Sequence, residues 1–180
     1  YINDLNNDFF KKKNFWFAAS TNEGEESFCI EINLKIKKNI EKIITIIAPR
    51  HINRSNAIKN ICNNFKLNTQ ILNKDEVIQD DMEIIIINSF GKLSNFFRYA
   101  KSVFIGKSLI KKLQKDAGQS PIDAANLGCK VYHGPYVYNF REVYETLKEN
   151  NISQEINSQE ELANYLIKDL SQKDKEISKY

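Results

Sequence analysis

Four short apolar runs, separated by longer segments of mixed polarity, constrain the fold of this chain more than any other feature. They cover residues 15–19, 43–48, 83–87 and 102–105. Runs of this length are typical of buried strands, and the segments between them carry apolar residues at helical spacing. Strands that alternate with helices along a chain predict a parallel sheet with helices on both faces. We therefore expect an α/β fold with a Rossmann-like sheet.

The same alternation continues through the rest of the chain. Weaker strands are expected at residues 69–72, 130–132 and near 152, and helices around 58–65 and over 91–100, 120–127, 139–149 and 158–170. At 180 residues the chain has the length of one ordinary domain. We expect this domain to occupy residues 15–170, after a polar linker or N-terminal extension over 1–14 and before a polar tail over 171–180.

The segment after the first strand fits two structures. Its apolar residues at 28, 30, 32, 34 and 36 alternate as in a strand, but those at 28, 32, 36 and 40 also form a stripe at helical spacing. Glu23, Glu25 and Glu26 stand where the start of a helix favours acidic side chains. A crossover is also needed before the next parallel strand. We therefore predict a helix.

Composition argues against several classes of protein. The net charge is only +3, from 26 basic and 23 acidic residues, and no basic stripe with interleaved aromatic residues predicts nucleic-acid binding. Cys29, Cys62 and Cys129 are too far apart for a zinc or redox motif, so we expect reduced thiols in the core. No apolar run approaches the ~20 residues that cross a bilayer, and no signal-peptide pattern opens the chain, so we expect it to be soluble.

Polar residues follow the first predicted strand. Ser20, Thr21 and Glu23 precede Gly24 and the start of a helix, so their hydroxyls and the free backbone N–H groups can hold an anion. The alternative is a simple helix cap with acids near the positive end of the helix dipole.

Arg50 and His51 follow the strongest predicted strand. A planar guanidinium at the carboxyl end of a strand suits bidentate binding of a phosphate. The alternatives are a surface ion pair for Arg50 and an ordinary loop histidine for His51.

Two later turns also carry candidate residues. Gly91, Lys92 and Leu93 form a strand-to-helix turn that suits a phosphate or a base, or is an ordinary glycine turn. Gly118, Gln119 and Ser120 lead into a helix whose dipole favours an anion, and Asp123 stands one turn later, where it can accept hydrogen bonds from a ribose diol. The alternative role of Asp123 is compensation of that dipole.

Taken in order, these motifs resemble the donor-binding half of the 3-deoxy-D-manno-octulosonic acid (Kdo) transferases, lipid A glycosyltransferases with two Rossmann-like domains. The resemblance spans roughly residues 16–149. Ser20–Glu26 match the family's Ser-Thr-His-Glu-Gly-Glu-Glu motif, with Asn22 in place of His. The other matching segments are Pro49-Arg50-His51, Gly134-Pro135 and Asn139-Phe140-Arg141. The departures are Lys92, where the family has Glu, and Ala117, Ser120 and Asp123 in a Gly-Gly-His/Gln-Asn-Pro-Leu/Ile-Glu motif.

The resemblance implies the C-terminal domain of a GT-B glycosyltransferase, which binds CMP-Kdo for transfer to a lipid A precursor in lipopolysaccharide biosynthesis. It implies no metal and no cofactor. The donor-binding residues that it implies are Ser20, Thr21, Glu23, Arg50, His51, Gly91, Lys92, Leu93, Ser108, Gly118, Gln119, Ser120, Asp123 and Asn139.

In the family, the catalytic base and the membrane-docking surface belong to the N-terminal half, and nothing in this chain matches that half. We therefore expect the chain to position the donor without activating the acceptor hydroxyl. The whole enzyme is expected at the cytoplasmic face of the inner membrane. Lys107, Lys111, Lys112 and Lys115 form either a solvated face or a contact with lipid phosphates. Another glycosyltransferase that uses a UDP- or GDP-sugar, and a non-catalytic nucleotide-binding module, remain alternatives.

Overall fold

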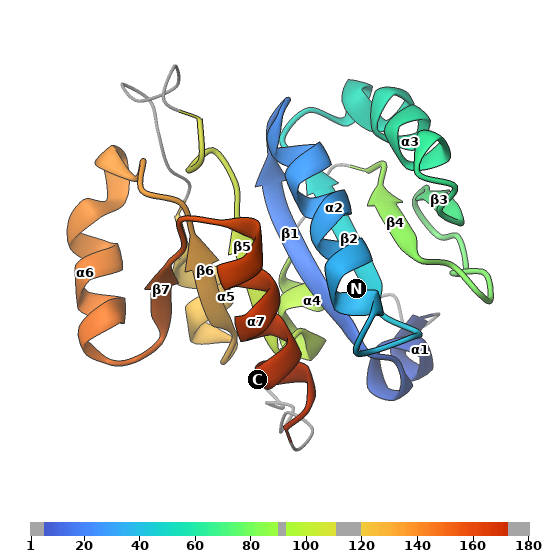
Figure 1. The fold of residues 1–180 in the computed structure, drawn as a ribbon. Helices are drawn as coiled ribbons and strands as arrows, with labels where there is room; N and C mark the ends of the chain where they lie inside the picture. The colour runs from blue at the N-terminus through green and yellow to red at the C-terminus, as the bar shows by residue number, and fades with distance from the viewer. Residues whose placement is uncertain (1–5, 90–92, 111–119, 173–180) are drawn as a thin grey trace.

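The computed structural model describes residues 6–89, 93–110 and 120–172, and these residues form a seven-stranded sheet (Figure 1). The strand order is β3-β4-β2-β1-β5-β6-β7, and every neighbouring pair is parallel. The strands are β1 (Phe15–Thr21), β2 (Ile44–Pro49), β3 (Thr69–Leu72), β4 (Ile84–Ile87), β5 (Ser102–Ile105), β6 (Lys130–His133) and β7 (Ser153–Glu155). The predicted parallel α/β sheet is confirmed.

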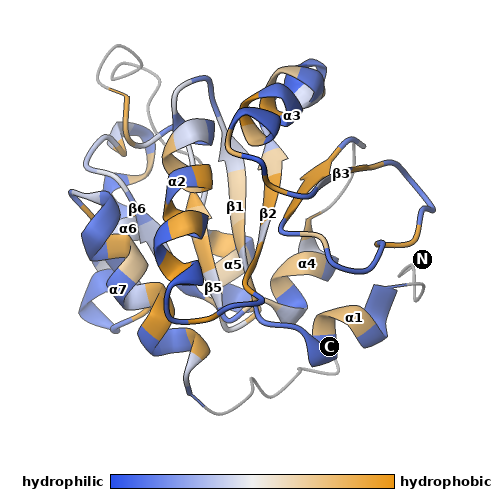
Figure 2. Cartoon of the chain, turned by 45° about the vertical axis from the view of Figure 1, so that its right-hand side comes forward, coloured by the Kyte–Doolittle hydropathy of each residue, from blue (hydrophilic) through white to orange (hydrophobic). Residues whose placement is uncertain are grey.

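Helices cover both faces of the sheet. One apolar layer joins the sheet to α2 (Glu25–Lys37), α3 (Ser55–Asn64) and α7 (Gln159–Leu170). The opposite layer joins it to α1 (Asn7–Lys12), α4 (Ser94–Tyr99), α5 (Ile122–Asn126) and α6 (Arg141–Glu149). Figure 2 shows the hydrophobic strands β1 and β2 in the middle of the molecule, between these layers. No helix within the described ranges is long and apolar enough to span a bilayer.

The ambiguous segment after β1 forms the predicted helix α2, because its stripe at helical spacing faces the sheet. Ile32 and Ile36 are fully buried there, as is Ile30. Its start also holds two buried acids, Glu25 and Glu26. The choice of helix is therefore confirmed.

At the periphery, the N-terminal segment is an extension that packs on the domain, and the end of α3 is more exposed than its apolar spacing indicates. A linker does not describe residues 6–12, because Asn7–Lys12 form α1 and the ring of Phe10 packs against Phe15 and Tyr99 in the core. Asn6 fixes this segment, since its side chain accepts a hydrogen bond from the backbone N–H of Ile78 at 2.9 Å. Phe65, expected on the buried face of α3, lies beyond the end of that helix and is 37% exposed.

The three cysteines lie in the core, as predicted. Cys29, Cys62 and Cys129 are free thiols and all are buried. Burial raises the pKa of Cys62 to about 11, so this thiol stays protonated at neutral pH. These residues act as small apolar side chains.

Candidate functional site

The candidate site lies where the strand order reverses. β1 sits between β2 and β5, so the chain leaves β1 toward one side of the sheet and later continues from β5 toward the other. In open parallel sheets, ligands bind in the crevice beyond the carboxyl ends of the two strands at such a switch point. The loop at residues 20–24 follows β1 and the loop at 106–110 follows β5, so both border this crevice.

The ends of β1 and β5 approach very closely. The backbone N–H of Gly106 donates to the carbonyl oxygen of Ala19 at 2.7 Å. A Cβ atom at Gly106 would lie 2.4 Å from the carbonyl oxygen of Ser20, so only glycine fits there. Ser20 itself has a φ of 58°, a left-handed conformation that a residue other than glycine adopts at some cost in strain.

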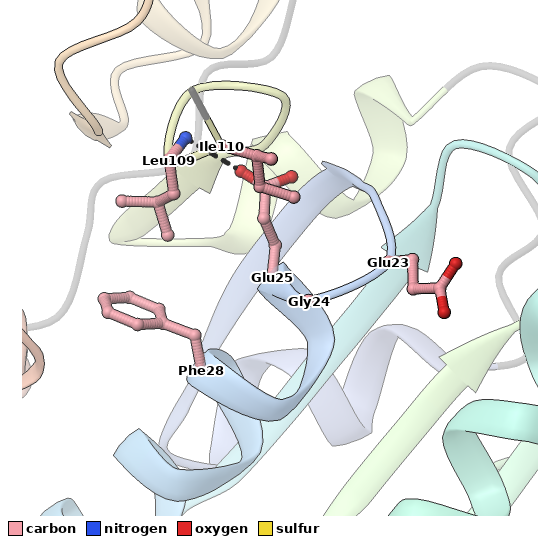
Figure 3. A pocket seen from close by; sticks show the side chains of 6 residues that line it. All are labelled: Glu23, Gly24, Glu25, Phe28, Leu109 and Ile110. Carbon is pink, nitrogen blue, oxygen red and sulfur yellow. Dashed lines mark hydrogen bonds between the residues drawn. The ribbon is translucent and has the colours of Figure 1, made fainter. Parts of the chain in front are cut away.

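Glu25 joins the two loops through its carboxylate, which is 1% exposed (Figure 3). Its Oε1 accepts hydrogen bonds from the backbone N–H groups of Asn22 at 3.0 Å and Lys107 at 2.7 Å. Its Oε2 accepts from those of Ser108 and Leu109, each at 3.1 Å. The sequence indicates only a helix-start acid at Glu25, because its contacts with residues more than 80 positions later leave no local pattern.

Ser108 connects a third loop to this network. Its hydroxyl donates to the carbonyl oxygen of Ile105 at 2.7 Å and accepts from the N–H of Gly134 at 2.9 Å. The side chain is fully buried. Ser108 therefore holds the ends of β5 and β6 together, and both hydrogen bonds of its hydroxyl are made to the backbone.

The side chain of Thr21 is buried at the end of β1. Its side chain is 2% exposed, and Oγ1 has no hydrogen-bond partner among the described residues. Its carbonyl oxygen accepts from the backbone N–H of Arg50 at 2.9 Å, which fixes the loop after β2 to the end of β1. Thr21 thus shapes the edge through its backbone.

Arg50 and His51 are exposed at the end of β2, where sequence predicts a phosphate contact. Among the described residues Arg50 makes no ion pair, whereas Arg54 pairs with the buried carboxylate of Glu26. Burial raises the pKa of Glu26 more than Arg54 lowers it. The surface ion pair considered for Arg50 is thus not found among the described residues, and the ion pair on the following turn joins Arg54 to a buried carboxylate.

Most of the remaining predicted residues are exposed in loops or at the starts of helices. Glu23 is exposed beside the start of α2, and Leu93 is half-buried before α4. Ser120 and Asp123 are exposed at the start of α5, where the hydroxyl of Ser120 accepts from the N–H of Ile122 at 3.3 Å. Asn139 is exposed in the 3₁₀ turn Tyr138–Phe140. Gly91, Lys92, Gly118 and Gln119 lie outside the described residues.

Two hollows open near this edge. One, of about 400 Å³, is lined by Glu23, Gly24, Glu25, Phe28, Leu109 and Ile110 at the switch point (Figure 3). The other, of about 560 Å³, is lined by Ile52, Asn53, Ser55, Asn56, Ile71, Asn73 and Asn88 beyond the ends of β2, β3 and β4. Apolar periodicity assigned Phe28 to a helix face and did not identify it as part of a pocket.

One histidine of the edge is held in its neutral form. His133, at the end of β6, is buried against Tyr144, and burial lowers its pKa, so it is neutral at pH 7. Its Nδ1 lies 2.7 Å from the carbonyl oxygen of Gly134. Within the described ranges no cluster of His, Cys, Asp and Glu side chains is arranged to hold a metal ion.

Two curated relatives with the same name illustrate the similarity of this chain to known proteins. No family model matches the chain. It is 24% identical over 143 residues to the 3-deoxy-D-manno-octulosonic acid transferase of Haemophilus influenzae, which covers 79% of this chain and 33% of that protein. It is 29% identical over 150 residues to the enzyme of the same name from Rickettsia typhi, covering 82% and 31%. The chain thus spans about a third of the length of these relatives.

Solved structures agree on the fold. The C-terminal CMP-Kdo binding domain of WaaA from Acinetobacter baumannii superposes with a TM-score of 0.81 and 20% identity, covering 93% of this chain and 86% of that one. A trehalose 6-phosphate synthase from Burkholderia multivorans superposes with a TM-score of 0.61 and 10% identity, over 92% of this chain and 37% of its own. The chain is therefore similar in sequence to Kdo transferases over about 80% of its length, and it shares the fold of the C-terminal CMP-Kdo binding domain of WaaA.

Proposed function

We propose that this domain binds CMP-Kdo and presents it for transfer to a lipid A precursor in lipopolysaccharide biosynthesis. The observation that carries the proposal is the match to about a third of the Kdo transferases, together with a fold shared with the CMP-Kdo binding domain of WaaA. The polar loops after β1, β2 and β5 support it, because they meet at the switch point of the sheet.

Arg50 is the residue best placed to bind the phosphate of the donor. Its guanidinium is exposed, has no ion pair among the described residues, and is carried by a backbone that is hydrogen bonded to the end of β1. During transfer, the bond between the sugar's anomeric carbon and the phosphate oxygen breaks, and CMP leaves with the electron pair. A fixed cation beside that phosphate stabilises the charge that develops on it.

Asp123 and Asn139 are proposed to bind the nucleoside or sugar hydroxyls. Both side chains are exposed, and a carboxylate that accepts from two ribose hydroxyls is a common arrangement in this type of sheet. α5 is only five residues long, so its dipole adds little to phosphate binding. The side-chain carboxylate of Asp123, not the helix end, is therefore assigned the binding role.

The acceptor side of the reaction is assigned to the other domain of the enzyme. On this proposal the acceptor hydroxyl attacks the anomeric carbon, and a base on that domain takes its proton. Two ionisable groups near the edge are not available as that base, since His133 is buried and neutral and Glu25 has its oxygens bonded to backbone N–H groups. We place the whole enzyme at the cytoplasmic face of the inner membrane, with Lys107 on the side of the lipid phosphates.

Calorimetric titration of the chain with CMP, CDP, UMP and GMP tests the proposal. We expect CMP to bind most tightly. Only one wall of an interdomain cleft is present, so dissociation constants between micromolar and millimolar are expected, or about −8 to −4 kcal/mol. Tighter binding of UMP or GMP than of CMP would instead assign the domain to a different nucleotide sugar, and absence of binding to every nucleotide would favour a non-catalytic module.

A further inference from the structure

Glu25 places a negative charge where a ligand anion is expected in this fold. Its carboxylate accepts four backbone N–H groups, one from the loop after β1 and three consecutive ones, at Lys107, Ser108 and Leu109, from the loop after β5. Successive N–H groups that converge in this way form an anion-binding nest. In this chain the nest is filled by a side chain of the protein itself, and that side chain is 1% exposed.

The nest adjoins the proposed phosphate site. The N–H of Arg50 is bonded to the carbonyl oxygen of Thr21 at 2.9 Å, and the next residue, Asn22, donates its own N–H to Glu25 at 3.0 Å. A single peptide unit therefore separates the backbone that carries Arg50 from the carboxylate in the nest. A ligand with two adjacent phosphates, held by Arg50 through one of them, would direct the other toward the nest.

The other acidic side chains at the start of α2 also disfavour a second phosphate. Glu23 lines the hollow at the switch point and is exposed. Glu26 is paired with Arg54, so that cation is already neutralised. The four backbone N–H groups of the nest are occupied and the exposed side chain of Glu23 beside it is acidic, so a second phosphate would meet no free N–H donor at the nest and a repelling carboxylate next to it.

We infer that Glu25 is a specificity-determining residue, an internal anion that takes the place of a second phosphate and restricts this edge to donors with one phosphate. The inference rests on the proposed function, because it concerns the same nucleotide site. It assigns Glu25 no direct contact with the donor. The residue acts by filling the nest and by holding the ends of β1 and β5 together.

The test compares the affinities of CMP and CDP by calorimetry for the wild type, Glu25→Ala and Glu83→Ala. Wild type should bind CDP no more tightly than CMP. Glu25→Ala should shift the ratio of the two affinities toward CDP by about tenfold, the worth of one charge-assisted hydrogen bond. Glu83 is the matched control, since its carboxylate also accepts a backbone N–H, from Asn68 at 2.9 Å, but lies before β4 at the opposite edge. Its removal should leave the ratio unchanged.

A second measurement separates this inference from the proposed function. Inorganic phosphate should raise the melting temperature of Glu25→Ala saturably and by more than it raises that of wild type, because the emptied nest accepts it. If wild type binds no CMP, the proposed function fails, and the phosphate experiment still decides whether the nest binds anions. Should Glu25→Ala not fold, Glu25→Ser also removes the carboxylate from the nest while keeping a hydroxyl at the start of α2, and it should shift the ratio in the same direction. Tighter binding of CDP than CMP by wild type, or an unchanged ratio in folded variants without phosphate stabilisation, would overturn the inference.

Discussion

Replacing Arg50 with alanine should weaken CMP binding while leaving cytidine binding almost unchanged. A charge-assisted hydrogen bond contributes about 1.5–3 kcal/mol, or roughly 10- to 100-fold in the dissociation constant. Because Arg50 is exposed, solvent screens its charge, and we expect a loss near the lower end, about tenfold. The loss should shrink as salt is raised, since exposed charges are screened within about 10 Å at 0.1 M ionic strength.

Calorimetry with CMP and cytidine on wild type, Arg50→Ala and Lys130→Ala measures this effect. Lys130 is the control for net charge, because it is exposed at the amino end of β6 and its ammonium group donates to the carbonyl oxygen of Asn151. Lys130→Ala should bind both ligands as wild type does. Equal weakening of CMP and cytidine by Arg50→Ala, or an Arg50→Ala affinity for CMP within about twofold of wild type, would refute the assignment of Arg50 to the phosphate.

Three further predictions follow from the site and its surroundings. Asp123→Asn should weaken CMP and cytidine alike but leave 2′,3′-dideoxycytidine monophosphate unaffected in calorimetry, and equal effects on all three would remove Asp123 from the ribose. Arg54→Met should raise the pKa of Glu26 further, because Arg54 lowers it. The loss of melting temperature relative to wild type should therefore be large at pH 7 and become smaller as the pH falls and Glu26 takes up a proton; a loss that is independent of pH would contradict this. The 180 residues alone should transfer no Kdo from CMP-Kdo to a lipid A precursor, since the base is assigned to the other domain, and turnover in a preparation free of host enzyme would show that assignment to be wrong.

The sheet could be predicted from the sequence because its central strands β1, β2, β4 and β5 are mostly apolar runs. Ile84–Ile87 and Ile44–Pro49 are buried along their whole length, which periodicity detects directly. α1 was missed because only Phe10 among its residues is buried, and one apolar residue in a polar segment gives no period. Its packing depends on partners such as Tyr99, far along the chain.

The candidate site was predictable by position but not by contact. Residues that follow strands, such as Arg50, could be placed at the carboxyl edge from the alternation of elements alone. The partners of Glu25, Ser108 and Glu26 could not, because each pairs with a loop from another part of the chain. The structure thus adds a framework role for both Ser108 and Glu25 that the sequence does not reveal.

The location of bound CMP tests the central claim most directly. In a two-dimensional amide NMR titration, CMP should shift the backbone signals of residues 20–24, 50–51 and 106–109, which border the switch point between β1 and β5. Signals at the opposite edge should stay unchanged, for example those of Lys101, which precedes β5, and Lys130, which begins β6. Shifts concentrated at that opposite edge, or no shifts from the folded chain at millimolar CMP, would contradict a donor site at the switch point.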